Sequence, residues 1–368
     1  MKKMQMNNNG ENKYKNKESD TPRKMSILKM LFIGLGTISI IVIVAFSWFL
    51  ISLFSKSDIA KMPEYYPFKS VKAKEQYLKY YDKRAREWPV VSESRIVETP
   101  YGKTFIRISG PINAPSLVLL PSTSASSLIW MPNIKALSVH YRVYAVDNIY
   151  DFGRSVNTRN IKGSDDMMNW LDELFTALDL GDSINLMGLS YGGWLASQYT
   201  LAHPNRLNKV IWLAPAATLF ELPGEWAWRG ILSALPHRYF MKKFMIEWFF
   251  EDLLKKNDEN SLKQLDELVD DAMMGLKCFR FRMPLTPSVL TDNELQCIKV
   301  STLFLVGENE KLYSAKKAVE RLNTVAPQIQ TEIVPNAGHD LTIVQVELVN
   351  KVVLDFLMKT TKPLNNLN

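Results

Sequence analysis

A serine between two glycines, in the order Gly-Leu-Ser-Tyr-Gly, is the stretch of this sequence with the clearest potential for chemistry. It follows the short apolar run 184–187 and precedes the helix-compatible run 194–201. Because Gly188 and Gly192 lack a Cβ, the chain can turn sharply from strand to helix and leave the Ser190 hydroxyl exposed at the apex. The N-terminus of the following helix then lies beside any negative charge that develops there. The pattern predicts a nucleophile, and the alternative is an ordinary serine in a glycine-rich loop.

Two further motifs lie toward the end of the chain. Gly-Glu-Asn-Glu at 307–310 follows an apolar run, and Asn-Ala-Gly-His at 336–339 follows another. With the serine motif they make residues 88–360 resemble the α/β-hydrolase superfamily, and within it the bacterial carboxylesterase-like serine hydrolases. The resemblance implies a serine hydrolase acting on ester bonds, with the catalytic serine, acid and histidine in that order along the chain.

The resemblance places the three catalytic roles on Ser190, Glu310 and His339. A serine hydroxyl is a weak nucleophile until an adjacent base accepts its proton, and a third group must orient that base. His339 follows both the serine motif and the late acidic loop, so it is predicted to be the general base and then the general acid. Glu310 is the predicted orienting carboxylate, and Glu308 and Asp340 are the alternatives.

The predicted oxyanion hole consists of two backbone N–H donors. One belongs to Tyr191, the residue after the nucleophile. The resemblance places the other in the loop after Leu120, where it assigns Thr123, with Ser122 or Ser124 as alternatives. Family members usually carry glycine in this loop and this chain does not. Losing one such donor typically costs about 2.7 to 4 kcal/mol of transition-state stabilisation, so a poorly shaped loop would slow catalysis.

The remaining histidines and the two cysteines do not suggest a metal or a cofactor. His140, His203 and His237 are scattered and are predicted to be structural, although His237 could approach a substrate from the predicted cap. Cys278 and Cys297 lack the spacing of metal ligands and are expected to be buried free thiols, with a single disulfide as the alternative. There is no glycine-rich phosphate loop. A serine rather than an aspartate at the turn disfavours haloalkane-dehalogenase and epoxide-hydrolase chemistry.

Alternating strands and helices predict an α/β fold with a doubly wound, mostly parallel sheet. An antiparallel hairpin opens it, and buried apolar runs follow. The expected strands are 95–99, 104–108, 117–120, 141–146, 184–187, 210–215, 301–306 and 332–334. Helices are expected at 128–137, 164–178 and 343–357. The α/β-hydrolase core is therefore assigned to 88–215 and 296–368.

The alternation stops for about 80 residues between the two parts of this core. Residues 216–295 are helical in character and rich in aromatic residues and methionine, and in the family an insertion here is a helical cap over the active site. Most of these side chains are expected to form the core of the cap, while some line an apolar substrate pocket. Residues 55–87 are assigned to a linker and a lead-in helix.

The N-terminus predicts a membrane anchor. Residues 1–29 are polar, basic and expected to be disordered, whereas 30–54 contain no charged residue and form a stretch long enough for a transmembrane helix. A cleavable signal peptide is the alternative, but the apolar run continues past Ala45 without a cleavage site. More Lys and Arg precede the span than follow it, which favours a cytoplasmic N-terminus and an extracytoplasmic catalytic domain at the cell membrane.

The charge distribution excludes a nucleic-acid-binding role. Residues 1–61 contain ten Lys and Arg against four Asp and Glu, whereas the remaining residues contain 35 against 34, so the basicity belongs to the tail. The expected partners are a small acyl or ester substrate and, through residues 30–54, the lipid bilayer. Acyl transfer, amide hydrolysis and perhydrolysis would use the same triad. A catalytically weak anchored binding or scaffolding protein of the same fold is the second hypothesis.

Overall fold

The computed structural model describes residue 47 and residues 63–235, 237–280 and 285–359. The predicted spanning segment, 30–54, lies outside these residues except for residue 47, and the tail 1–29 lies wholly outside them. Among the residues that are described, no helix is both long and apolar enough to cross a membrane. The anchor therefore stays a prediction.

A single mixed sheet organises residues 63–359. Its strands lie in the order β1-β2-β4-β3-β6-β7-β8-β9, with β5 paired to β2. β1 and β2 form an antiparallel hairpin, and β2 also pairs antiparallel to β4, while every pair from β4 to β9 is parallel. The bounds are β1 Ser92–Thr99, β2 Gly102–Ser109, β3 Ser116–Leu120, β4 Arg142–Val146, β5 Val156–Asn157, β6 Ile184–Leu189, β7 Leu207–Leu213, β8 Ser301–Gly307 and β9 Gln330–Val334. The predicted α/β class and mostly parallel sheet are confirmed.

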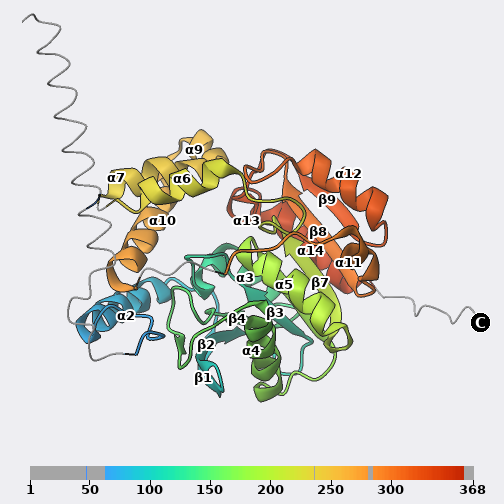
Figure 1. The fold of residues 1–368 in the computed structure, drawn as a ribbon, viewed down its shortest axis with the longest axis horizontal. Coiled ribbons are helices and arrows are strands. Elements are labelled where there is room, and N and C mark those ends of the chain that lie inside the picture. Colours follow the sequence, from blue (N-terminus) through green and yellow to red (C-terminus); the bar gives the residue numbers. More distant parts are fainter. Residues whose placement is uncertain (1–46, 48–62, 236, 281–284, 360–368) are drawn as a thin grey trace, which may run out of the picture. The chain divides into compact units, whose positions relative to one another are not determined.

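Helices cover both faces of the sheet, as Figure 1 shows. The side chains of each central strand alternate between two hydrophobic clusters, as the two-residue period of a strand requires. In β6, Leu186 belongs to the cluster beneath α4 and α5, whereas Met187 belongs to the cluster beneath α3 and α14. The core helices are α3 Met131–Leu137, α4 Ser164–Ala177, α5 Tyr191–Ala202, α11 Asp292–Cys297, α12 Ala315–Val325, α13 Leu341–Val344 and α14 Val346–Met358, with the short 3₁₀ turns η2 Ser127–Trp130 and η3 Pro204–Arg206.

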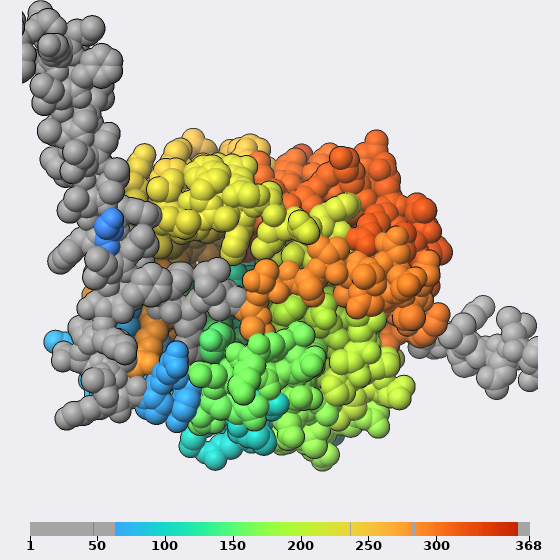
Figure 2. Space-filling model, in the orientation of Figure 1, coloured from blue at the N-terminus to red at the C-terminus, as the bar shows by residue number. Residues whose placement is uncertain are grey.

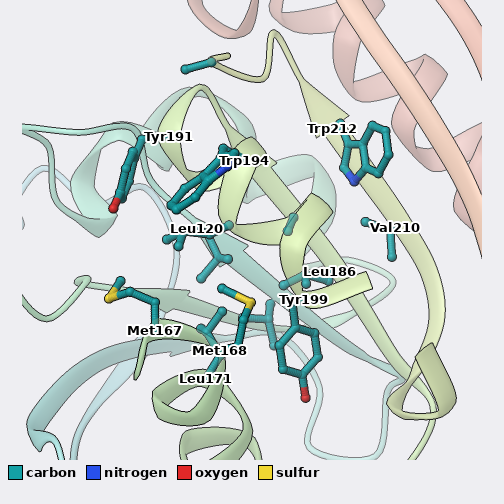
Figure 3. Close-up of a cluster of buried hydrophobic side chains, with 14 of the residues drawn as sticks. Leu120, Met167, Met168, Leu171, Leu186, Tyr191, Trp194, Tyr199, Val210 and Trp212 are labelled. Atoms are coloured by element: carbon teal, nitrogen blue, oxygen red, sulfur yellow. The ribbon is translucent and has the colours of Figure 1, made fainter. Parts of the chain in front are cut away.

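The first of these clusters lies directly under the serine turn. Figure 3 shows Met168 and Leu171 of α4 facing Leu186 of β6, with Trp194 of α5 above them. Trp194 is 1 % exposed and its ring centroid lies 5.2 Å from that of Tyr191. Burying aromatic side chains of this size removes a large apolar area from water, so the beginning of α5 is held firmly against the sheet.

A group of helices, the predicted cap, interrupts the core between β7 and β8. It comprises α6 Gly224–Ser233, α7 Arg238–Met241, the π-helical turn η4 Lys242–Ile246, α8 Glu247–Phe249, α9 Glu251–Lys256 and α10 Glu259–Cys278. Figure 2 shows these helices, in yellow and light orange, gathered beside the core. They share a cluster that includes Met241, Leu253 and Leu265. Leu290, Leu295 and Ile298, which follow these helices, pack into the large core cluster beneath α4 and α5.

The lead-in helix α2, Val71–Ala85, joins this cap to the hairpin. Tyr77 and Phe279 stack edge to face, with ring centroids 4.7 Å apart. The Tyr80 hydroxyl donates a hydrogen bond to Asp271 of α10 at 2.5 Å, and Arg84 forms an ion pair with the same carboxylate at 3.2 Å. These contacts fix the far end of α10.

Candidate active site

Ser190 sits at the junction of β6 and α5 in a backbone conformation that few L-residues adopt. Its φ is 55° and its ψ is −112°. A Cβ at Gly188 would lie 2.0 Å from the carbonyl oxygen of Gly192, and a Cβ at Gly192 would lie 2.2 Å from that of Leu120. Since no side chain fits at either distance, both glycines are required for the turn to close. Strain of this kind at a single non-glycine residue is characteristic of functional sites.

Neighbouring backbone holds the strained residue in place. The Ser190 N–H donates to the Leu213 carbonyl at 2.9 Å, and the Ser190 carbonyl accepts from Ala216 and Trp194, each at 3.0 Å. These bonds tie the turn to the end of β7 and to the first turn of α5. Ser190 itself is 5 % exposed. Three backbone hydrogen bonds therefore fix the turn without any contribution from side chains.

The structure brings Glu310 and His339 together. His339 Nδ1 lies 3.0 Å from Oε1 and 2.9 Å from Oε2 of Glu310. The Glu310 side chain is fully buried, and the His339 side chain is 9 % exposed. With the carboxylate accepting from Nδ1–H, the other ring nitrogen is left as a proton acceptor. This is the arrangement that a histidine base needs.

The loop after β8 shapes the Glu310 carboxylate for this role. Its Oε1 accepts hydrogen bonds from the N–H groups of Lys311 and Leu312 at 2.8 and 2.9 Å. Tyr313 is buried nearby, and burial, reinforced by the Glu310 charge, raises the pKa of its phenol well above the usual range. Glu310 is therefore held by backbone donors, and its oxygens still reach the imidazole.

The two alternative acids have other partners. Glu308 is exposed and accepts a hydrogen bond from the Asn336 N–H at 3.2 Å. Asp340 is 1 % exposed, and its two oxygens accept from the N–H groups of Gly338 and Leu253 at 3.0 and 2.9 Å. Asp340 thus joins the histidine loop to α9 of the cap, which the sequence did not indicate.

All three predicted triad residues follow strands at one edge of the sheet, where parallel strands present their carboxyl ends. Ser190 follows β6, the loop of Glu310 follows β8 and the loop of His339 follows β9. Among the hydrogen bonds of the described residues, those of Ser190 run through its backbone and none joins its hydroxyl to His339. Catalytic hydrogen bonds are often long without substrate, and the serine–histidine step stays a prediction.

The predicted oxyanion loop leaves β3 beside the elbow, the turn 188–192 that carries Ser190. A Cβ at Gly192 would lie 2.6 Å from the Pro121 carbonyl oxygen, so the loop begins in contact with α5. Ser124 has a φ of 57°, and its N–H donates to Asp151 Oδ1 at 2.9 Å. Since this N–H is already bonded, Ser124 is a poor choice of oxyanion donor. Thr123, Ser122 and Tyr191 stay as predicted.

Two of the other histidines, His203 and His237, have structural surroundings, and His140 is exposed. His203 stacks on Tyr199 with ring centroids 4.8 Å apart, and His237 accepts the Tyr239 N–H at the start of α7 at 3.2 Å. Both cysteines are free thiols; Cys278 is buried, but Cys297 is exposed, so the expectation that both are buried was wrong. α11 ends at Cys297 and places it on the surface of the core.

Cap residues contact the histidine loop directly. The ring of Phe249 lies 4.7 Å from that of His339, centroid to centroid. Asn309, next to the predicted acid, donates from Nδ2 to both oxygens of Asp252 at 3.1 Å. Lys311 forms an ion pair with Glu251. The segment 249–253 therefore touches the loops of both Glu310 and His339.

The sequence predicted a helical cap over the active site but not its contacts with the loops of Glu310 and His339. Phe249 was one aromatic residue among many, and nothing near Asp252 or Glu251 in sequence signals a partner more than fifty residues away. The one available signal was the polar pair Asn309 and Lys311 flanking the predicted acid. Their partners come from tertiary packing, which local patterns do not encode.

Comparison with known proteins agrees with this fold. A model of the alpha/beta hydrolase family matches residues 117–351. The carboxylesterase YbfK of Bacillus subtilis is 34% identical over 297 residues, covering 79% of this chain and 96% of that protein. Its crystal structure superposes with a TM-score of 0.71 at 32% identity, covering 79% of this chain and 100% of that chain. The naproxen esterase of Bacillus subtilis superposes with a TM-score of 0.71 at 30% identity, over 78% of this chain and 99% of that chain.

The chain therefore belongs to the α/β-hydrolase family. Within that family it is a carboxylesterase-like hydrolase, similar to enzymes that cleave esters. The family resemblance and the enzyme class predicted from the three motifs are both confirmed. The individual site residues rest on the geometry described above.

A first prediction concerns the elbow. Gly192→Ala places a Cβ against the Leu120 carbonyl, so the backbone must shift, and overpacking of this kind costs about 1–3 kcal/mol. We expect the variant to lose stability in urea denaturation and most of its esterase activity. Gly224→Ala is the matched control because no atom lies within 4 Å of a Cβ there. Equal stability of the two variants would contradict the close approach.

A second prediction concerns Asp340. Burial, with a smaller contribution from Asp252, raises the pKa of its carboxyl to about 6, against about 3.9 in an unfolded chain. The folded state therefore binds this proton more tightly, and the stability it contributes at low pH is lost as pH rises from about 4 through 6. We expect the free energy of unfolding of the parent to fall relative to Asp340→Asn over that interval and to level off above it. A difference that is constant or grows with pH would contradict the burial argument.

Proposed function

We propose that the protein is a membrane-anchored serine hydrolase that cleaves carboxylic esters or related acyl compounds through an acyl-enzyme on Ser190. The observation that carries the proposal is the contact of His339 Nδ1 with both oxygens of the buried Glu310 carboxylate. It leaves a base of fixed orientation at the sheet edge where Ser190 is held in a strained turn.

The proposed reaction begins with proton transfer from the Ser190 hydroxyl to His339 while the serine oxygen attacks the ester carbonyl. Glu310 stabilises the imidazolium that forms. The N–H groups of Tyr191 and Thr123 bind the oxyanion of the tetrahedral intermediate. His339 then protonates the departing alcohol, and an acyl-enzyme remains. Water, deprotonated by the same histidine, attacks the acyl carbonyl and releases the acid.

An apolar acyl or alcohol group fits the surroundings of this site. Phe249 lies against His339, and Phe220 and Trp226 pack on the same hydrophobic cluster as Tyr191. Ligand pockets are lined mainly by such side chains. One relative carries the name naproxen esterase, after an aromatic and largely apolar acid. We therefore propose lipophilic esters as the substrate class.

Labelling by a serine-directed fluorophosphonate tests the proposed nucleophile. We expect the full-length protein to be labelled and to hydrolyse a p-nitrophenyl ester, and Ser190→Ala and His339→Ala to lose labelling. Glu310→Gln is expected to lower kcat about a thousandfold or more, because an amide favours the wrong imidazole tautomer. Glu308→Gln, in the same loop but bonded to Asn336, is the matched control and keeps its activity.

Full esterase activity in Ser190→Ala would end this proposal. A parent that folds but is neither labelled nor active would favour the second hypothesis, an anchored binding or scaffolding protein. The feature that favours that hypothesis is the loop after β3, which contains no glycine and has committed the Ser124 N–H to another partner.

The proposed anchor is tested separately. We expect the full chain to stay with membranes through alkaline carbonate washing, and an Ile41→Lys, Ile43→Lys variant to be released, because each lysine at the centre of a span costs about 2.5–3.5 kcal/mol. A protease can be added to cells whose wall has been removed and whose membrane is intact. Digestion of the catalytic domain would then support its predicted extracytoplasmic location. Release of the parent by carbonate would contradict the anchor.

A further inference from the structure

The loop after β3 adopts an unfavourable shape without glycine. Residues 121–126 contain no glycine, yet Ser124 has a φ of 57°, in the left-handed region. A non-glycine residue in this region carries backbone strain, which persists only when surrounding contacts enforce it. Some group outside the loop must therefore hold it.

That group is the carboxylate of Asp151, in the loop after β4. Its Oδ1 accepts hydrogen bonds from the Ser124 N–H at 2.9 Å and from the Phe152 N–H at 2.7 Å. Because β3 and β4 are parallel neighbours, their loops leave the sheet side by side and a short side chain can bridge them.

The position of this carboxyl is unfavourable for a charge. Desolvation, assisted by the nearby Asp147, raises the pKa of Asp151 to about 7 even though the N–H groups of Phe152 and Ser124 act to lower it. Among the ion pairs of the described residues none includes Asp151. Asp151 is half-buried, and its hydrogen bonds to the N–H groups of Ser124 and Phe152 are the contacts that stabilise its carboxylate.

The cap also contacts the loop after β4, which carries Asp151. A Cβ at Gly275 of α10 would lie 2.1 Å from the ring of Phe152, which also packs against Phe279 with centroids 4.9 Å apart. Phe152 follows Asp151 directly in sequence. The cap therefore fixes the loop that carries Asp151, and Asp151 in turn fixes the loop that carries Thr123.

We propose that Asp151 is a positioning residue for catalysis, which holds residues 122–124 so that the Thr123 N–H completes the oxyanion hole. In this chain a carboxylate from the neighbouring loop takes the place of a glycine-rich turn. The inference rests on the proposed function. It assigns Asp151 no contact with substrate.

Asp151→Ala is the test, measured in the full-length protein. We expect kcat to fall about 10- to 100-fold with KM within about threefold of the parent, because an oxyanion donor acts in the transition state. Inhibition by a trifluoromethyl ketone, which forms a tetrahedral adduct with the serine, should weaken by the same factor as kcat. A general loss of packing would not link these two quantities.

Two variants control this measurement. Asp151→Asn keeps the Oδ1 acceptor and should retain kcat within about fivefold. Asp166→Ala removes a carboxylate that also holds a loop N–H, that of Lys162 at 2.8 Å, but lies away from the elbow, and it should match the parent. If Asp151→Ala does not fold, Asp151→Ser takes its place, since a serine hydroxyl can still bond locally but is too short to reach Ser124.

The outcomes separate the two proposals. Parent-like kcat and ketone affinity in folded Asp151→Ala or Asp151→Ser, while Ser190→Ala is inactive, would overturn the role of Asp151 and leave the proposed function standing. An Asp151→Asn protein as impaired as Asp151→Ala would also overturn it, because the acceptor would then be irrelevant. Full activity in Ser190→Ala would instead overturn the proposed function.

Discussion

The active edge of this protein depends on one close approach between backbones. The first turn of α5 lies so near the end of β3 that a Cβ at Gly192 would be 2.2 Å from the Leu120 carbonyl oxygen. That contact sets where Ser190 points and where the loop of Thr123 begins. Trp194 and Tyr191, buried beneath the same helix, keep it from moving away. The proposed nucleophile and the proposed oxyanion loop are thus positioned by main-chain contacts, and side chains refine the arrangement.

Strain collects along this same edge. Non-glycine residues with positive φ follow β3, β4, β6, β7 and β9; they are Ser124, Tyr150, Ser190, Ala214, Ala217 and Asn336. Each departs from the conformations that L-residues favour, and such departures concentrate where function requires them. The opposite edge of the sheet needs fewer, because it only has to return the chain. The backbone strain is therefore concentrated in the loops that follow these five strands.

Much of this could be predicted from sequence. The strands are strongly apolar, and the glycines around Ser190 indicate a sharp turn, so the sheet and the elbow can be predicted from local patterns. Glu310 and His339 were assigned through resemblance, and the structure pairs them at 2.9 Å. The role of Asp151 could not be predicted, because the need for it arises from the φ of Ser124, a residue 27 positions away. Contacts that satisfy another segment's strain leave no trace in the periodicity of either segment.

The contacts of α9 with the core limit how the cap can move. Lys256 donates to the Val344 carbonyl at 3.0 Å, in addition to the contacts of Asp252 and Leu253 with the loops of Glu310 and His339. If α9 moved away from the core, the contacts that hold the loops of Glu310 and His339 would break. In α6, by contrast, the side chains of Trp228 and Ile231 are exposed. Any opening of the cap that preserves the contact between Glu310 and His339 must therefore leave α9 in place.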